Sequence, residues 1–137
     1  MEIETVKTTS ISTVSLFSVL LFLFACNQQP TQPNGSGQLI GTWVYERYEN
    51  GLTIMKRSVS LDSSKYGFII HRDGKFVERK NAGWCGTPPI SYANFAGEWR
   101  AQADSVLSID VDFWGGRMNY IMLVVSLTES ELKFKRE

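Results

Sequence analysis

The stretch VLSIDVDF at residues 106–113 decides the fold class, because apolar and polar side chains alternate from Leu107 to Phe113. The apolar set is Leu107, Ile109, Val111 and Phe113. The polar set is Ser108, Asp110 and Asp112. Successive side chains of a β-strand point to opposite faces of the sheet. The alternation therefore predicts an antiparallel strand with one buried and one solvated face.

Short strand patterns of this kind recur through residues 39–137, separated by tight turns. Asn50-Gly51 and Asp73-Gly74 are the strongest hairpin signals, because a tight hairpin needs residues that tolerate positive φ. The pattern predicts about eight strands and no convincing helix, and consecutive strands should be neighbours in the sheet. An eight-stranded meander loses its exposed edges by closing. We therefore predict an all-β fold, an antiparallel up-and-down meander that closes into a small barrel.

Two strands carry further expectations about burial. The first, over residues 39–48, places Gly41, Trp43 and Tyr45 on one face. The seventh, over residues 117–127, becomes apolar on both faces near its end, which predicts cover on both sides.

Composition limits the classes of function. The chain of 137 residues is long enough for one domain, with 43% hydrophobic residues and a formal net charge of zero. Without a basic excess there is no phosphate-binding face, which argues against nucleic acid as a partner. Two cysteines and one histidine argue against a Cys/His zinc site.

The N-terminal region reads as a targeting segment. Residues 11–25 carry no charge. Their length suits the apolar core of a signal peptide and is shorter than the roughly 20 residues of a transmembrane helix. Cys26 follows directly, and residues 27–37 (NQQPTQPNGSG) are polar and rich in Pro and Gly, as a flexible tether would be. An uncut signal anchor and a Cys26 buried in an N-terminal helix are the alternatives.

The tetrapeptide LFAC at residues 23–26 resembles the lipobox of bacterial lipoproteins. The resemblance implies that Cys26 receives a diacylglycerol thioether, that residues 1–25 are removed as a signal peptide, and that residues 26–38 tether the domain of residues 39–137. Acyl chains would then hold the protein on a membrane of the bacterial cell envelope. In the lipoproteins that this sequence resembles, acidic residues just after the cysteine often mark surface export. Residues 27–38 hold none, so the resemblance implies the outer membrane, facing the periplasm.

Further motifs resemble the lipocalins, and more closely the short lipocalin-like lipoproteins of Bacteroidota-type bacteria. They are Gly41-Thr42-Trp43, the hairpin DGKF at residues 73–76, Gly97-Glu98-Trp99, and SLTESEL at residues 126–132. The resemblance implies an up-and-down barrel whose closed end is plugged by Trp43, with Gly41 and Trp99 as further anchors. It also implies a basic side chain over Trp43, for which the candidates are Arg136, Lys133 and Lys135.

The least ordinary stretch is NAGWCGTPPISY at residues 81–92. One interpretation is a rigid loop at the barrel mouth that presents Trp84, Cys85 and Tyr92 to a ligand or partner. The other, which we favour, has Trp84 and Cys85 packed inward as a cap, because cysteine is among the most buried residue types. In either case Cys85 has no disulfide partner if Cys26 is lipidated.

Two other groups of residues could carry out chemistry, but we interpret both as structural. A Cys85–His71 couple is the one nucleophile–base pair that the sequence offers, but a lone hairpin histidine more often faces solvent. Asp110 and Asp112, with Glu98 on a neighbouring strand, would suit calcium or paired carboxylates. We expect them instead on a solvated outer face.

Several aromatic side chains would either line a ligand cavity or fill the barrel completely, and filling is favoured in so small a domain. They are Trp43, Tyr45, Phe68, Trp99, Phe113, Tyr120 and Phe134.

These observations lead to a non-catalytic, lipid-anchored domain without metal or cofactor, which binds a small hydrophobic or amphipathic ligand. The alternative is a structural or interaction module with a filled barrel that packs against a protein partner of the cell envelope.

Overall fold

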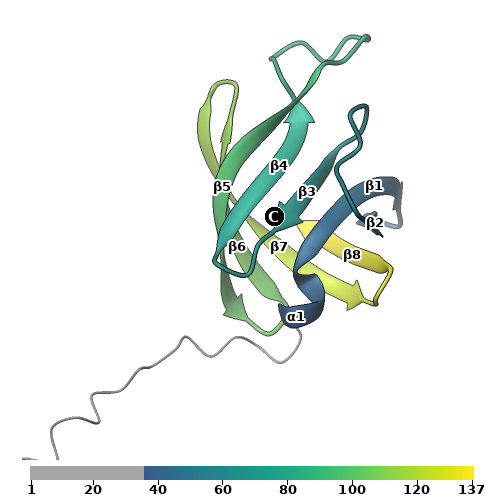
Figure 1. The fold of residues 1–137 in the computed structure, drawn as a ribbon, viewed down its shortest axis with the longest axis vertical. Helices are drawn as coiled ribbons and strands as arrows, with labels where there is room; N and C mark the ends of the chain where they lie inside the picture. The colour runs from purple at the N-terminus through teal and green to yellow at the C-terminus, as the bar shows by residue number, and fades with distance from the viewer. Residues whose placement is uncertain (1–35) are drawn as a thin grey trace, which may run out of the picture. The chain divides into compact units, whose positions relative to one another are not determined.

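The computed structural model describes residues 36–137 of the chain. The predicted signal peptide, the lipidation site Cys26 and most of the predicted tether lie outside the described residues. One short helix, α1 (Ser36–Leu39), precedes eight strands (Figure 1). The strands are β1 (Gly41–Glu49), β2 (Leu52–Ser58), β3 (Gly67–Ile70), β4 (Lys75–Asn81), β5 (Tyr92–Ala103), β6 (Val106–Phe113), β7 (Gly116–Leu127) and β8 (Glu131–Arg136).

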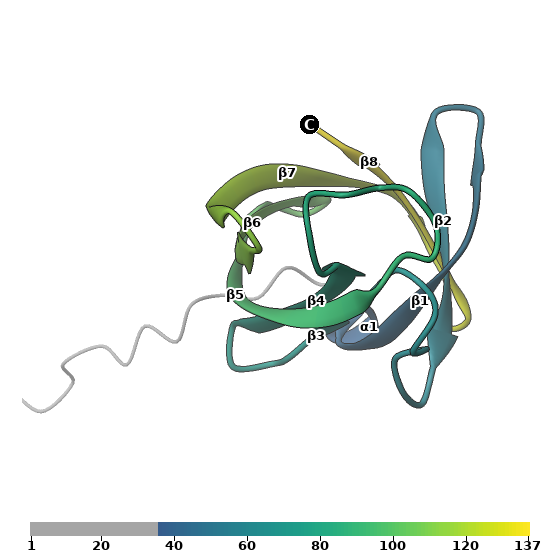
Figure 2. The same cartoon turned by 90° about the horizontal axis from the view of Figure 1, so that it is seen from above.

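The strands form a closed antiparallel barrel, which confirms the predicted fold class (Figure 2). Around the barrel the order is β1-β2-β8-β7-β6-β5-β4-β3, and β3 pairs with β1 to close the ring. Strands β3 to β8 are consecutive neighbours as expected. The β1–β2 hairpin, however, lies between β3 and β8, so β2 and β3 are not neighbours. Closure leaves no unpaired edge on the barrel.

Local sequence explains the main hairpins. Asn50 and Gly51 both have positive φ (52° and 80°), as the tight β1–β2 turn requires. In β6 the alternation predicted from VLSIDVDF is confirmed, because Leu107, Ile109 and Val111 are buried while the residues between them are only partly buried.

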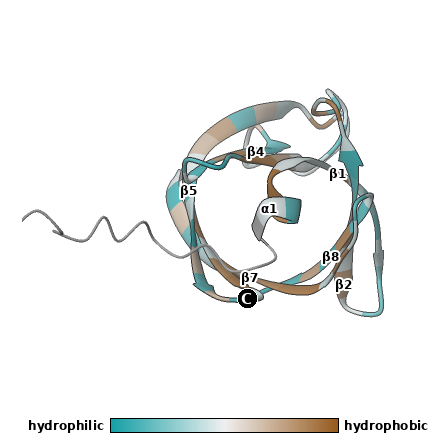
Figure 3. Ribbon diagram, turned by 60° about the horizontal axis from the view of Figure 1, so that its bottom comes forward, coloured by the Kyte–Doolittle hydropathy of each residue, from teal (hydrophilic) through white to brown (hydrophobic). Residues whose placement is uncertain are grey.

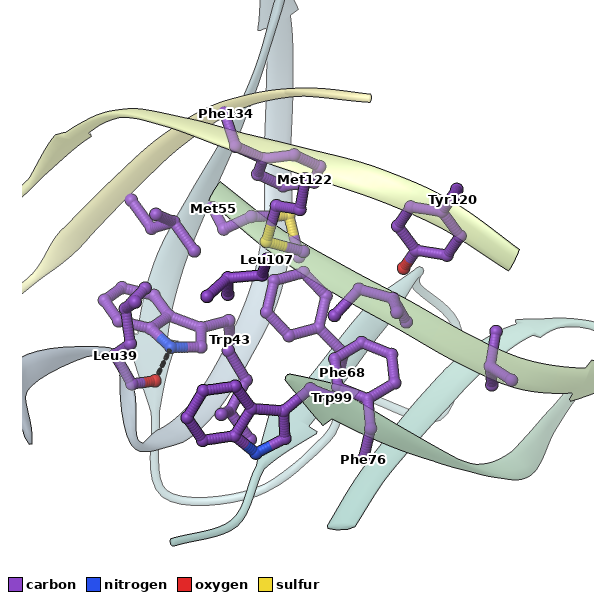
Figure 4. Close-up of a cluster of buried hydrophobic side chains, with 14 residues drawn as sticks. Leu39, Trp43, Met55, Phe68, Phe76, Trp99, Leu107, Tyr120, Met122 and Phe134 are labelled. Atoms are coloured by element: carbon purple, nitrogen blue, oxygen red, sulfur yellow. Dashed lines mark hydrogen bonds between the residues drawn. The ribbon is translucent and has the colours of Figure 1, made fainter. Parts of the chain in front are cut away.

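One end of the barrel, which we term the closed end, is covered by α1 (Figure 3). Trp43 on β1 is fully buried there, and its indole Nε1 donates a hydrogen bond of 2.9 Å to the carbonyl oxygen of Leu39 in α1 (Figure 4). The guanidinium of Arg57 lies 4.2 Å from the centre of the Trp43 ring. Gly41 has a φ of 135°, and a Cβ there would meet the Arg57 side chain at 2.6 Å. The Gly-x-Trp sequence thus leaves room for the arginine that covers the tryptophan.

Above Trp43 the interior is packed with apolar side chains. Phe68 contacts both Phe76 and Phe134, with ring centres 5.4 Å and 5.8 Å apart. The same cluster contains Trp99, Tyr120 and Met122 (Figure 4). Five of the seven aromatic residues singled out from the sequence are buried in it, Tyr45 packs against it, and Phe113 does not belong to it. Side-chain packing therefore fills the closed end and the middle of the barrel.

The structure corrects two details of the sequence prediction. A helix is present, since residues 36–39 form the single turn α1 rather than part of a tether or strand. The end of β7 is not covered on both faces, because Val125 is 59% exposed. The apolar run there spans a strand that faces the interior on one side only. Among the described residues, no helix has the length and apolar character needed to cross a membrane.

Candidate ligand-binding mouth

The other end of the barrel, which we term the mouth, holds two pockets. The first, the tyrosine pocket, has a volume of about 310 Å³ and is lined among others by Tyr45, Tyr66, Tyr92, Phe134, Lys65 and Arg136. The second, the tryptophan pocket, has a volume of about 340 Å³ and is lined among others by Trp84, Phe113, Trp114, Met118, Lys80 and Arg136. Arg136 is common to both, so the two pockets flank one guanidinium.

The mouth is assembled from segments that are distant in the sequence. Arg136 and Phe134 come from β8, and Tyr92 begins β5. Trp84 lies in the β4–β5 loop, which extends beyond the strands in Figure 1. Trp114 lies in the β6–β7 turn, where Phe113 and Gly116 pair and leave Trp114 and Gly115 as the turn residues. The indole of Trp114 is exposed in this turn.

A buried polar cluster lies inside the barrel near the mouth, centred on Glu78. This carboxylate is fully buried. It accepts hydrogen bonds from the hydroxyl groups of Tyr66 (2.8 Å) and Tyr120 (3.2 Å) and from Lys80 Nζ (2.6 Å). A buried carboxylate is tolerated only when it is paired and hydrogen-bonded, and these three donors meet that condition.

Both phenols of the cluster remain protonated donors. Burial, with the nearby charge of Glu78, raises the pKa of Tyr120 far above that of an exposed tyrosine, and burial together with Tyr120 and Glu78 does the same for Tyr66. Neutral hydroxyl groups donate to the carboxylate, whereas phenolates would repel it. The two hydroxyl groups therefore remain hydrogen-bond donors over the ordinary pH range.

Arg136 links this cluster to the pockets. Its guanidinium lies over the ring of Tyr120, 3.7 Å from the ring centre, and 3.8 Å from Glu78 Oε1. Its one hydrogen bond among the described residues is a 3.5 Å contact from Nη2 to the sulfur of Met118, a weak acceptor. The group is thus oriented by stacking while most of its N–H donors stay available.

Sequence reasoning missed Glu78, although the sequence contained a signal. In β4, Phe76 is buried, and the period of two places Glu78 and Lys80 on the same inward face. A carboxylate two residues from a core phenylalanine, followed by a lysine at the next inward position, indicates a buried ion pair. The two partners that complete the cluster carry no local signal, because Tyr66 lies just before β3 and Tyr120 lies on β7.

The predicted loop residues take different positions at the mouth. Trp84 and Tyr92 line the tryptophan and tyrosine pockets. The inward packing that we favoured for Trp84 and Cys85 is wrong, because Trp84 is 81% exposed and Cys85 is exposed. Cys85 lies beside the pockets rather than lining them. Hydrogen bonds from the amide and hydroxyl of Thr87 lower the pKa of its thiol.

The arginine expected over Trp43 was assigned to the wrong strand. Arg57 on β2 occupies that position, while Arg136 stacks on Tyr120. The reason is the direction of β8. Its first residue, Glu131, pairs with Lys56 next to Arg57 at the closed end, so the strand carries Arg136 away to the mouth.

The structure separates His71 from Cys85. His71 is exposed before β4, and Cys85 follows the end of that strand. Seven residues of strand correspond to roughly 20 Å at about 3.3 Å per residue, so the two side chains do not form a nucleophile–base couple.

Asp110 and Asp112 lie on the outer face of β6, as expected, and both bind Arg117 (2.6 Å and 3.1 Å). Glu98 pairs with Asp110 across β5 and β6, also as expected. Within the described part of the chain, no group of three or more His, Cys, Asp and Glu side chains has the arrangement of a metal site.

Comparison with protein-family models, with curated proteins and with solved structures gives no match to this chain. The geometry of the mouth is therefore the basis of the proposed function. Concave aromatic pockets with a few oriented polar groups are typical of small-molecule sites.

Proposed function

We propose that this chain is a non-catalytic binding protein whose mouth holds one small amphipathic molecule. The tyrosine pocket is the observation that carries the proposal. Its volume of about 310 Å³ is at the lower end of the range for ligand sites, roughly 300–1,000 Å³. Phe134 and three tyrosines supply apolar surface, while their hydroxyl groups and Arg136 supply polar contacts. Such a mixture suits a molecule with an apolar body and one polar end.

The packing of the closed end supports a ligand site that is confined to the mouth. Trp43, Phe68 and Phe76 fill the interior below the mouth, so a ligand would be shallow rather than enclosed. The binding surface would be largely pre-formed, because strand pairing and the hydrogen bonds of Glu78 fix the walls. Pre-formed walls reduce the ordering cost of binding.

A neutral probe tests the proposal. Octanol should bind the full chain saturably in calorimetry, and Thr53→Phe, which adds a ring inside the tyrosine pocket, should abolish that binding. Gln102→Phe adds the same ring at an exposed position of β5 and should leave binding unchanged. If Thr53→Phe folds and binds octanol as the parent does, the tyrosine pocket is not the site.

A second candidate function is an interaction module of the cell envelope. The exposed aromatic rim favours it, since Trp84 is 81% and Trp114 is 53% exposed. Exposed apolar groups clustered at one end of a domain are a mark of docking surfaces. This candidate predicts no saturable binding of octanol, which separates it from the first.

We also propose that a lipid on Cys26 anchors the domain to a membrane of the bacterial cell envelope, at the outer membrane and facing the periplasm. The supporting observation is the sequence LFAC followed by a polar tether. Intact-mass spectrometry of the mature protein should give an N-terminus at Cys26 with acyl mass, and Cys26→Ser should leave the precursor uncut. A mature N-terminus at another residue would refute the anchor.

A further inference from the structure

The charged side chains that line the two pockets of the mouth are all basic. Neither pocket is lined by an acidic side chain, whereas Lys65 and Arg136 line the tyrosine pocket and Lys80 and Arg136 the tryptophan pocket. Glu78 is buried beneath them. Asp62 lies beside the tyrosine pocket but is held by the amide and hydroxyl of Ser64. The charged side chains that line either pocket are therefore cations.

The charge of Glu78 is already balanced. Lys80 Nζ lies 2.6 Å from it, and two tyrosine hydroxyl groups occupy further lone pairs of the carboxylate. Arg136 is 3.8 Å away and makes no hydrogen bond to it among the described residues. Arg136 is consequently a surplus cation held next to a neutralised pair.

The position of Arg136 is fixed even though most of its donors have no partner among the described residues. It pairs with Met122 in the β7–β8 ladder, and the next residue, Glu137, exchanges two backbone hydrogen bonds of 2.9 Å with Ile121. Stacking on Tyr120 orients the guanidinium plane. A planar guanidinium with free N–H groups matches the two oxygens of a carboxylate.

We propose that the mouth selects amphipathic carboxylates, with Arg136 receiving the carboxylate and the tyrosine or tryptophan pocket receiving the apolar body. This inference rests on the binding function proposed above and adds the sign of the ligand's charge to it. Lys65 on the rim contributes long-range attraction for an anion.

Three probes of equal chain length test the selection in calorimetry on the full chain: octanoate, octanol and octyltrimethylammonium. Octanoate should bind about tenfold or more tightly than octanol, as expected for a charge-assisted hydrogen bond, and octyltrimethylammonium should bind most weakly. Arg136→Gln should lower octanoate affinity about tenfold more than it lowers octanol affinity, so that the advantage of octanoate disappears. Arg100→Gln removes a charge from the outer face of β5 and is the matched control.

The outcomes separate the two proposals. Equal affinity for all three probes, or a preference for the cation, would overturn anion selection and leave the binding function standing. Absence of binding for every probe would overturn both. If Arg136→Gln does not fold, added salt serves instead, because it should weaken octanoate binding and spare octanol. A salt-independent preference for octanoate would contradict the role of Arg136.

Discussion

Both ends of the barrel hold an arginine against an aromatic ring, but the two arginines differ in how their N–H groups are used. At the closed end, Arg57 covers Trp43 and donates to the carbonyl oxygens of Gln38, Ile40 and Glu129. At the mouth, Arg136 covers Tyr120 and donates among the described residues to one methionine sulfur.

The difference suggests what each end does. Arg57 ties the segment before β1 and the β7–β8 turn to the first tryptophan, so its donors stabilise the fold. Arg136 is positioned equally well but retains donors for another molecule. Stacking on an aromatic ring is common to the two arginines, and the number of protein acceptors is what separates them.

The largest expected effect is at Trp43. Trp43→Ala should lower the free energy of unfolding by about 3–5 kcal/mol, because it removes a fully buried indole, leaves a cavity and exposes the base of the core. Trp84→Ala, at an 81% exposed position, should change stability by less than about 0.5 kcal/mol. Denaturant unfolding followed by circular dichroism measures both. Comparable losses for the two variants would show that the ends do not differ in packing.

The second largest effect on stability is expected at the buried carboxylate of Glu78. Glu78→Ala leaves Lys80 and two tyrosine hydroxyl groups without their acceptor, and should cost about 3 kcal/mol. Glu98→Ala, on the outer face of β5, is the control and should cost less than about 1 kcal/mol. A Glu78→Ala protein as stable as the parent would mean that water satisfies the cluster, and that the mouth is less rigid than the hydrogen bonds imply.

The two arginines give a smaller but more direct contrast. Arg57→Ala should destabilise the fold by about 2 kcal/mol, since it removes charge-assisted hydrogen bonds and the cover of Trp43. Arg136→Ala should cost less, about 1 kcal/mol, because its partly exposed guanidinium stacks on Tyr120 but has few other protein partners among the described residues. Unfolding curves of the two variants, recorded in parallel, provide the comparison. The reverse order would invalidate the division between structural and binding arginines.

The smallest effect concerns Cys85, where no change in stability is expected. Because Thr87 lowers the pKa of the exposed thiol, its thiolate forms at lower pH than that of an unstructured cysteine. The pH at which iodoacetamide reaches half its maximal rate should accordingly be lower in the native protein than in the unfolded chain. Peptide mass spectrometry assigns the adduct to Cys85.

Thr87→Val removes one of the two hydrogen bonds to the thiol and should move that midpoint part of the way back. Slow alkylation in the native state would instead support the inward packing of this loop.

The barrel was predictable from the sequence because the patterns that specify its strands and turns are local. Alternation in residues 106–113 and the Asn50-Gly51 turn act within a few residues of one another. The insertion of the β1–β2 hairpin between β3 and β8 was not predictable, since it depends on pairing between strands far apart in the chain.

The candidate site at the mouth was predictable only in part. The unusual composition of residues 81–92 indicated a candidate site, and the structure brings Trp84 and Tyr92 to the two pockets. Whether that loop turned inward or outward depended on how the interior was already filled, which no local pattern reveals. Glu78 was detectable from the inward period of β4, but its partners lie on β7 and just before β3.

The tryptophans provide the most direct test of the account, because two lie at each end. Trp43 and Trp99 are buried toward the closed end, whereas Trp84 and Trp114 are exposed at the mouth. Fluorine NMR of protein labelled with fluorotryptophan, with each signal assigned by a Trp→Phe variant, would follow all four during a titration with octanoate. We predict saturable shifts for Trp84 and Trp114, which line the pocket shared with Arg136, and unchanged signals for Trp43 and Trp99. Shifts at Trp43 and Trp99 with unchanged signals at Trp84 and Trp114 would contradict a ligand-binding mouth above a closed, filled base.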